Sequence, residues 1–117
     1  MLSYFAPYNS NTSNVSARQR EMFSPVFSDH VDPVVLAANT LYRHPVPAGA
    51  RFVHFSFDGD FLARAGGVTD SIAVPTATAT TGLAGELNPA ARRLLGGATH
   101  ILLISETARK GSLAFYG

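Results

Sequence analysis

Two strand-like runs joined by Asp58-Gly59 constrain this chain more than any other feature. Residues 52–57 are rich in β-branched and aromatic side chains, and a second run follows at residues 60–64. Asp-Gly between two such runs is among the strongest local signals for a β-hairpin, because a type I′ turn needs positive φ at both central residues. The sequence therefore predicts a hairpin over residues 52–64.

The alternation within the first run predicts which side of that hairpin is buried. Val53, Phe55 and Phe57 occupy alternate positions and are all apolar. His54 and Ser56 fall between them, and successive strand residues point to opposite faces of a sheet. We therefore expect the apolar set to face a core and His54 and Ser56 to lie on the wetter face.

The C-terminal region predicts a second pair of strands. Residues 100–105 form an apolar run, residues 106–111 are polar, and residues 112–116 return with Leu113 and Phe115 on one face. This pattern indicates a second hairpin that would complete a β core.

The remaining elements are short. Residues 34–42 predict the first strand, although periodicity alone does not distinguish it from a short buried helix. Residues 44–49 predict a loop, residues 72–74 a short strand, and residues 76–81 either an edge strand or an extended loop. Asn88 is a favoured helix cap, Pro89 is favoured at the first helical position, and Gly96 is a suitable stop. One short helix is therefore expected near residues 89–95.

These elements together predict an all-β protein, a single β-sandwich or jelly-roll-like domain. We place this domain at residues 34–117 and an extended N-terminal arm at residues 1–33. The arm is polar and interrupted by prolines, yet it carries aromatic side chains that are costly to leave in water. These rings either fold back onto their own sandwich or dock into a neighbouring subunit. The candidate interface residues are Tyr4, Phe5, Tyr8, Phe23 and Phe27.

Composition limits the functions that such a chain can have. The 117 residues include no cysteine, which excludes thiol catalysis, cysteine-ligated zinc and disulfides. A formal net charge of +1 gives no electrostatic footprint for nucleic acid or an anionic membrane, so neither partner is expected. We also expect no signal peptide and no membrane-spanning helix.

No residue pattern predicts an active site, a metal site or a cofactor. The histidines, at positions 30, 44, 54 and 100, show no metal-ligand spacing, and His30 and Asp32 form only a weak pair in a proline-bounded loop. Asp58 and Asp60 superficially resemble part of a calcium loop but lack the further oxygen ligands. No serine lies in a nucleophile motif, so we expect a protein that is not an enzyme and needs no cofactor.

The layout of residues 51–117 resembles that of a known family. The hairpin FSFDGDF, the stretch ELNPAARRL and the closing run THILLISETARKGSLAFYG are similar to small accessory structural proteins of tailed-bacteriophage virions, the capsid decoration or cement type. This resemblance implies a non-enzymatic protein that stabilises a phage head through its arm and one sandwich face. The implied partners are the major capsid protein or other virion proteins and further copies of the chain. The implied location is the virion, assembled in the host cytoplasm.

A second hypothesis is a small ligand- or carbohydrate-binding β-sandwich module. It predicts a concave face with exposed aromatic residues, such as Tyr42 or Tyr116, beside polar partners. A hydrolytic enzyme would need a carboxylate pair or a histidine–acid pair that the fold brings together, and no spacing in the sequence indicates one.

Overall fold

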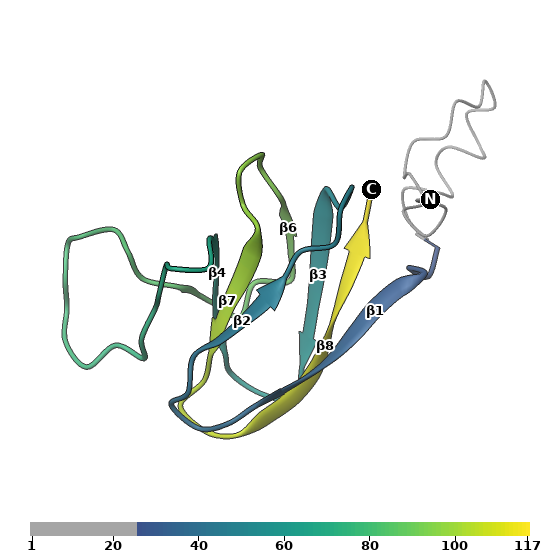
Figure 1. Ribbon diagram of the computed structural model, residues 1–117. Helices are drawn as coiled ribbons and strands as arrows, with labels where there is room; N and C mark the ends of the chain where they lie inside the picture. The colour runs from purple at the N-terminus through teal and green to yellow at the C-terminus, as the bar shows by residue number, and fades with distance from the viewer. Residues whose placement is uncertain (1–25) are drawn as a thin grey trace, which may run out of the picture.

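Eight antiparallel strands form two four-stranded sheets in the computed structural model, which describes residues 26–117 (Figure 1). Sheet A has the order β1-β8-β3-β6 and sheet B has the order β2-β7-β4-β5. The strands are β1 (His30–Leu36), β2 (Tyr42–Pro45), β3 (Phe52–Phe57), β4 (Leu62–Gly66), β5 (Glu86–Leu87), β6 (Ala91–Arg93), β7 (His100–Ile104) and β8 (Arg109–Tyr116).

The strand pairing shows that the chain is one long hairpin that has been rolled up. β1 pairs with β8, β2 with β7, β3 with β6 and β4 with β5, so the two halves run beside each other from the ends to the β4–β5 connection. Two further pairings, β3 with β8 and β4 with β7, close the roll into two sheets. This is the strand order of a jelly roll, and it confirms the predicted all-β sandwich.

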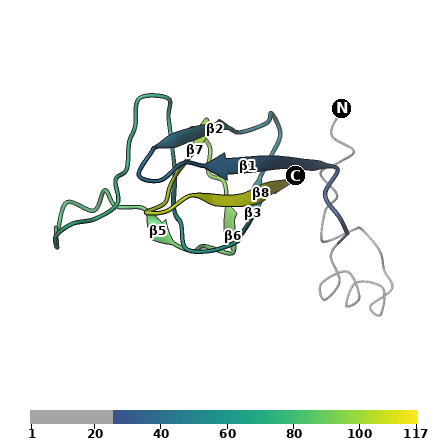
Figure 2. The same cartoon turned by 90° about the horizontal axis from the view of Figure 1, so that it is seen from below.

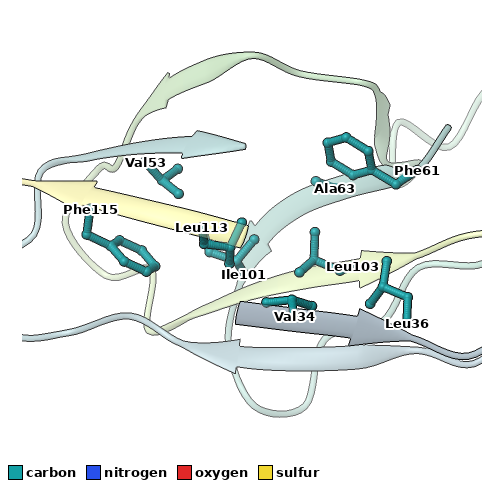
Figure 3. Close-up of a cluster of buried hydrophobic side chains, with 9 residues drawn as sticks. All are labelled: Val34, Leu36, Val53, Phe61, Ala63, Ile101, Leu103, Leu113 and Phe115. Carbon is teal, nitrogen blue, oxygen red and sulfur yellow. The ribbon is translucent and has the colours of Figure 1, made fainter. Parts of the chain in front are cut away.

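The core lies between the two sheets (Figure 3). Val53 faces it with no exposed surface, and Phe55 and Phe57 pack against it while half-buried, so the predicted alternation is confirmed. Each fully buried side chain of this size contributes roughly 1.5–3 kcal/mol. The buried cluster comprises Val34, Leu36, Val53, Phe61, Ala63, Ile101, Leu103, Leu113 and Phe115.

The predicted hairpin at residues 52–64 is wrong. β3 belongs to sheet A and β4 to sheet B, so the connection between them crosses from one sheet to the other. Neither Asp58 nor Gly59 has the positive φ of a type I′ turn. Asp58 instead bonds to β8, where its backbone N–H donates to the carbonyl of Lys110 at 3.0 Å and its carboxylate accepts the N–H of Lys110 at 3.2 Å. Pairing with a distant strand thus outweighs the local turn signal.

The predicted second hairpin, over residues 100–116, is wrong for the same reason. β7 lies in the middle of sheet B and β8 in the middle of sheet A, and they share no ladder. At the end of β7, the Ser105 hydroxyl donates to the carbonyl of Thr107 at 2.5 Å, and the N–H of Asn39 donates to the carbonyl of Ser105. β7 and β8 therefore pack face to face.

The predicted helix near residues 89–95 is also absent, and β6 occupies its place. Asn88 has a φ of 50°, which is left-handed, and it does not cap a helix. Its amide oxygen accepts the backbone N–H of Phe61 at 2.9 Å, and its amide nitrogen donates to Asp60 at 2.8 Å. A helix this short is marginal in water, so strand pairing with β3 prevails.

The predicted strand over residues 34–42 is two strands in different sheets. β1 starts earlier, at His30, and ends at Leu36. Asn39, with a φ of 54°, lies in the turn that follows, and the chain then enters β2 in sheet B. β2 includes His44 and Pro45, which the sequence had placed in a loop. The division between an arm and a domain at residue 33 stays a prediction.

The outer face of sheet B has its own small apolar cluster. Leu102 and Ile104 point outward from β7 and are buried beneath the long β4–β5 connection, which supplies Ile72 and Val74. Residues 72–74 and 76–81 are not strands, so the extended-loop alternative holds for the second of these segments. The connection lies on the sheet B side of the molecule, away from sheet A (Figure 1).

Candidate functional site

The first half of the edge strand β1 points polar residues inward, and the strand exposes apolar residues on its outer side. Val31 and Val35 are 51% and 72% exposed on the outside of sheet A, and Pro33 lies exposed between them. The first two inward positions are His30 and Asp32, which pair with the core residues of β8. Because one face of an edge strand normally buries its apolar residues, this arrangement marks the outside of β1 as a candidate interaction surface.

The segment just before β1 extends the same surface. Phe27 is 96% exposed and Val26 is 55% exposed. The segment is held at the end of β8, because the Tyr116 hydroxyl donates to the carbonyl of Val26 at 2.8 Å and the Ser28 hydroxyl lies 2.5 Å from the carbonyl of Phe115. The exposed ring of Phe27 is therefore carried on an anchored backbone.

We call the outward side of β1, β8 and β3 the outer face of sheet A. Its centre carries small side chains, among them Ser112 and Ala114, which are paired in register with Pro33 and Val31. Lys110 is the one residue of the set with a full charge. The outward residues are Val31, Pro33, Val35, Phe52, His54, Ser56, Lys110, Ser112, Ala114 and Tyr116.

Beneath this surface, four polar side chains form a hydrogen-bonded chain that we call the edge clasp. The Tyr42 hydroxyl lies 2.8 Å from Nδ1 of His44, and Nε2 of His44 lies 2.7 Å from Oδ2 of Asp32. The same oxygen of Asp32 lies 3.1 Å from Nε2 of His30. The edge clasp joins β1 of sheet A to β2 of sheet B and closes this side of the sandwich.

The environment of the edge clasp fixes its charges. Burial tends to raise the pKa of Asp32, but hydrogen bonds from His44 and His30 and the attraction of both rings outweigh it, so the pKa lies below 3.8. Burial raises the pKa of the Tyr42 hydroxyl, and the negative charge of Asp32 adds to this effect. At neutral pH the edge clasp therefore contains a carboxylate and a neutral phenol.

The order hydroxyl, imidazole and carboxylate is that of a catalytic triad, and the fold does bring a histidine–acid pair together. Burial and the negative charge of Asp32 raise the pKa of the Tyr42 hydroxyl and hold the phenol neutral. The ring of His44 is also stacked on Phe115, with centroids 5.9 Å apart and planes 10° from parallel. This packing favours a structural role. Among residues 26–117, no group of three or more histidine, aspartate or glutamate side chains has an arrangement that could hold a metal ion.

The opposite open side of the sandwich carries a simpler pair. Arg92 of β6 and Glu86 of β5 point inward and meet, with Nη2 and Nε of the guanidinium 2.7 and 3.0 Å from Oε1 of the carboxylate. Their side chains are 50% and 59% exposed. The hydrogen bond from Arg92 lowers the pKa of Glu86, and burial opposes it.

A cavity of about 390 Å³ opens where the β3–β4 and β7–β8 connections meet. Phe61, Leu62 and Leu87 supply part of its apolar wall, and Glu106 and Arg109 supply polar groups. Its volume lies within the range of small-molecule sites. The edge clasp does not line this cavity.

The candidate interface residues predicted from the sequence fall into two groups. Phe27 lies beside the outer face of sheet A and is almost fully exposed. Tyr4, Phe5, Tyr8 and Phe23 lie outside the described residues.

The aromatic residues of the second hypothesis are both hydrogen-bonded. Tyr42 is 37% exposed and belongs to the edge clasp, and Tyr116 is only 7% exposed. They therefore do not form the exposed aromatic face that this hypothesis expected.

Comparisons with protein-family models, with curated proteins and with solved structures found no significant match. Within residues 26–117, no helix is long and apolar enough to cross a bilayer. A function for this chain therefore has to be inferred from its fold and its surfaces.

Proposed function

We propose that this protein is a non-enzymatic structural component of a phage virion, of the capsid decoration type. It contacts neighbouring virion proteins through its N-terminal arm and the outer face of sheet A. The observation that carries the proposal is the concentration of exposed apolar residues at one edge: Val26, Phe27, Val31 and Val35 are all more than half exposed.

The grouping of exposed apolar residues before and along β1 supports an interaction role. Single exposed apolar residues are normal on soluble proteins, whereas contiguous apolar patches mark contact sites. Val31 and Val35 each lie two residues from Pro33 on the same face of β1, and Phe27 is exposed on the anchored segment that precedes the strand. Covering these side chains releases ordered water and contributes roughly 25 cal/mol for each Å² removed from solvent.

The fold is compatible with the proposal but does not select it. Jelly rolls occur in viral capsid proteins, in lectin domains and in cupins. Since unrelated functions share this fold, the surface has to carry the inference.

Association with a particle tests the proposal. A lysate of host cells that produce virions with this protein should be fractionated by density-gradient centrifugation. The protein should co-sediment with icosahedral particles. A Val31→Lys/Val35→Lys variant should lose most of this association, because it places two charges on the apolar edge. The matched control is Val68→Lys, which changes a 63% exposed valine in the β4–β5 connection. A protein that stays at the top of the gradient as a free monomer would contradict the proposal.

A ligand-binding module remains the second candidate because of the 390 Å³ cavity. Phe61 is buried at its wall and Leu87 is 64% exposed at its mouth. A panel of glycans and small apolar ligands should be screened by thermal shift. A ligand that raises the Tm of the wild type but not of Leu87→Lys would favour this candidate over the virion component.

A further inference from the structure

We propose that residues 1–25 of one copy dock across the outer face of sheet A of a second copy, over Val31 and Val35. This inference rests on the proposed function and names the acceptor surface of the arm. It follows from where the described chain begins, how long the preceding segment is, and what the face offers.

The described chain begins at the end of β1 that is farther from Val35. Residues 26–28 lie beside the end of β8, held by the Tyr116 and Ser28 contacts. β1 then runs back along β8 from His30 toward Leu36. Figure 2 shows the described chain entering β1 from the side opposite to the β4–β5 connection. To reach Val35 of the same copy, the preceding residues would have to reverse direction and retrace the length of β1.

The segment is long enough to leave its own domain. Twenty-five extended residues span up to about 80–90 Å, whereas the seven residues of β1 span about 23 Å. When two copies lie with their β1 edges adjacent, each segment starts close to the outer face of sheet A of the other copy. Such an exchange of identical elements forms a closed two-fold pair.

The chemistry of the segment matches that of the face. The first seventeen residues of the chain carry no charged side chain and include Tyr4, Phe5 and Tyr8. Over β1, β8 and β3, the outer face of sheet A carries a single full charge, at its Lys110 end, and small side chains at its centre. The next charge on this side is Arg93, which lies on β6 at the far edge of the sheet. Large rings packed over small residues between two valines bury apolar surface without leaving a charge unpaired.

Pro33 favours docking over the face instead of strand addition along the edge. The N–H of Arg51 donates to the carbonyl of Tyr116, so the carbonyl of Tyr116 points toward β3. Alternate residues of a strand direct their N–H and C=O groups to the same neighbour, so those of Ser112, four residues earlier, also point toward β3. Its partner Pro33 therefore turns its backbone toward the free edge. Because proline has no N–H, a further strand would lack a donor at the middle of β1.

Disulfide trapping tests the inference, since the natural chain has no cysteine. Chains with Tyr4→Cys or Tyr8→Cys should be mixed with chains carrying Val31→Cys or Val35→Cys and then oxidised. We expect a covalent dimer of the two chains, formed at least about tenfold faster than with the control Val68→Cys. Circular dichroism of each variant checks that the sandwich is folded.

The remaining outcomes either support or overturn the inference. Equal trapping by Val68→Cys would overturn it, and so would trapping only within single chains that carry both cysteines. An oligomeric state, measured by sedimentation, that is unchanged on deletion of residues 2–25 would also overturn it. Failed trapping with intact particle association would leave the proposed function standing, whereas successful trapping without particle association would overturn the proposed function alone.

Discussion

Polar side chains bridge the two sheets at both open sides of the sandwich, but they are buried on one side and exposed on the other. On each side, inward positions of the edge strands carry polar groups that reach from one sheet to the other. On the β1–β2 side, the His44 side chain is only 8% exposed and bonds to both Tyr42 and Asp32. On the β5–β6 side, Arg92 and Glu86 form an ion pair that is at least half exposed.

This difference predicts unequal contributions to stability. Removing one partner of a buried hydrogen bond leaves the other unsatisfied and costs about 1–3 kcal/mol. An exposed ion pair gains little, because water and salt screen it. Inward-facing polar groups on both sides also discourage the addition of a further hydrogen-bonded strand to either edge. The edge clasp should therefore stabilise the fold, whereas the exposed pair mainly keeps its edge polar.

The largest effect is expected for His44→Ala. This change removes a buried ring from Phe115, takes one of the two histidine partners from Asp32, and removes the ring nitrogen to which the Tyr42 hydroxyl is bonded. We expect the free energy of unfolding to fall by about 2–4 kcal/mol, measured by urea denaturation. His100→Ala, which changes a partly exposed histidine outside the edge clasp, is the control and should cost less. Equal losses of unfolding free energy in His44→Ala and His100→Ala would show that the edge clasp adds no stability beyond that of an ordinary histidine.

Asp32→Asn should have the next largest effect. The neutral amide keeps the shape but removes the charge that accepts from His30 and His44, at a cost of about 1–2 kcal/mol. Urea denaturation at pH 7 measures the loss. A variant as stable as the wild type would show that the carboxylate charge adds nothing.

The same residue predicts a dependence of stability on pH. The folded pKa of Asp32 lies below its ordinary value of 3.8, so the unfolded chain takes up a proton first as pH falls. The stabilisation is therefore fully present above about pH 5 and is lost as pH falls through 3.8 and the folded pKa. The difference in unfolding free energy between wild type and Asp32→Asn should shrink over this acid range. A constant difference down to pH 2.5 would contradict the assignment.

Tyr42→Phe should have a smaller effect. It removes the hydroxyl that is hydrogen-bonded to Nδ1 of His44, at a position that is 37% exposed, where water can replace it. We expect a loss of about 1 kcal/mol or less. Thermal unfolding followed by circular dichroism measures it.

The smallest effect is expected for Glu86→Gln on the opposite side. The change breaks an exposed ion pair with Arg92, so the unfolding curves of variant and wild type should overlap in 0.15 M salt. A loss as large as that of Asp32→Asn would contradict the comparison between the two sides.

The sequence predicted the fold class because alternation within strands is a local property. Val53, Phe55 and Phe57 face the core as expected. The partners of each strand could not be predicted, because Asp58-Gly59 reports only on local turn preference while Asp58 bonds to the distant β8. Pairing between residues far apart decided the topology.

The edge clasp could not be assembled from the sequence for a related reason. His30 and Asp32 are two residues apart, as are Tyr42 and His44, so each pair shares one face of a strand. That spacing indicates, from sequence alone, that the two side chains of each pair can lie close together. Only the placement of β1 and β2 on the same side of the sandwich, in different sheets, brings the two pairs into contact.

The central positions of β7 and β8 have a consequence for how the protein is made. β8 separates β1 from β3, and β7 separates β2 from β4, so neither sheet exists without residues 100–116. During translation, the first six strands emerge from the ribosome with apolar edges that lack their partners. Folding of this domain must therefore wait until the last two strands have emerged, and a nascent chain stalled before residue 100 should stay sensitive to protease.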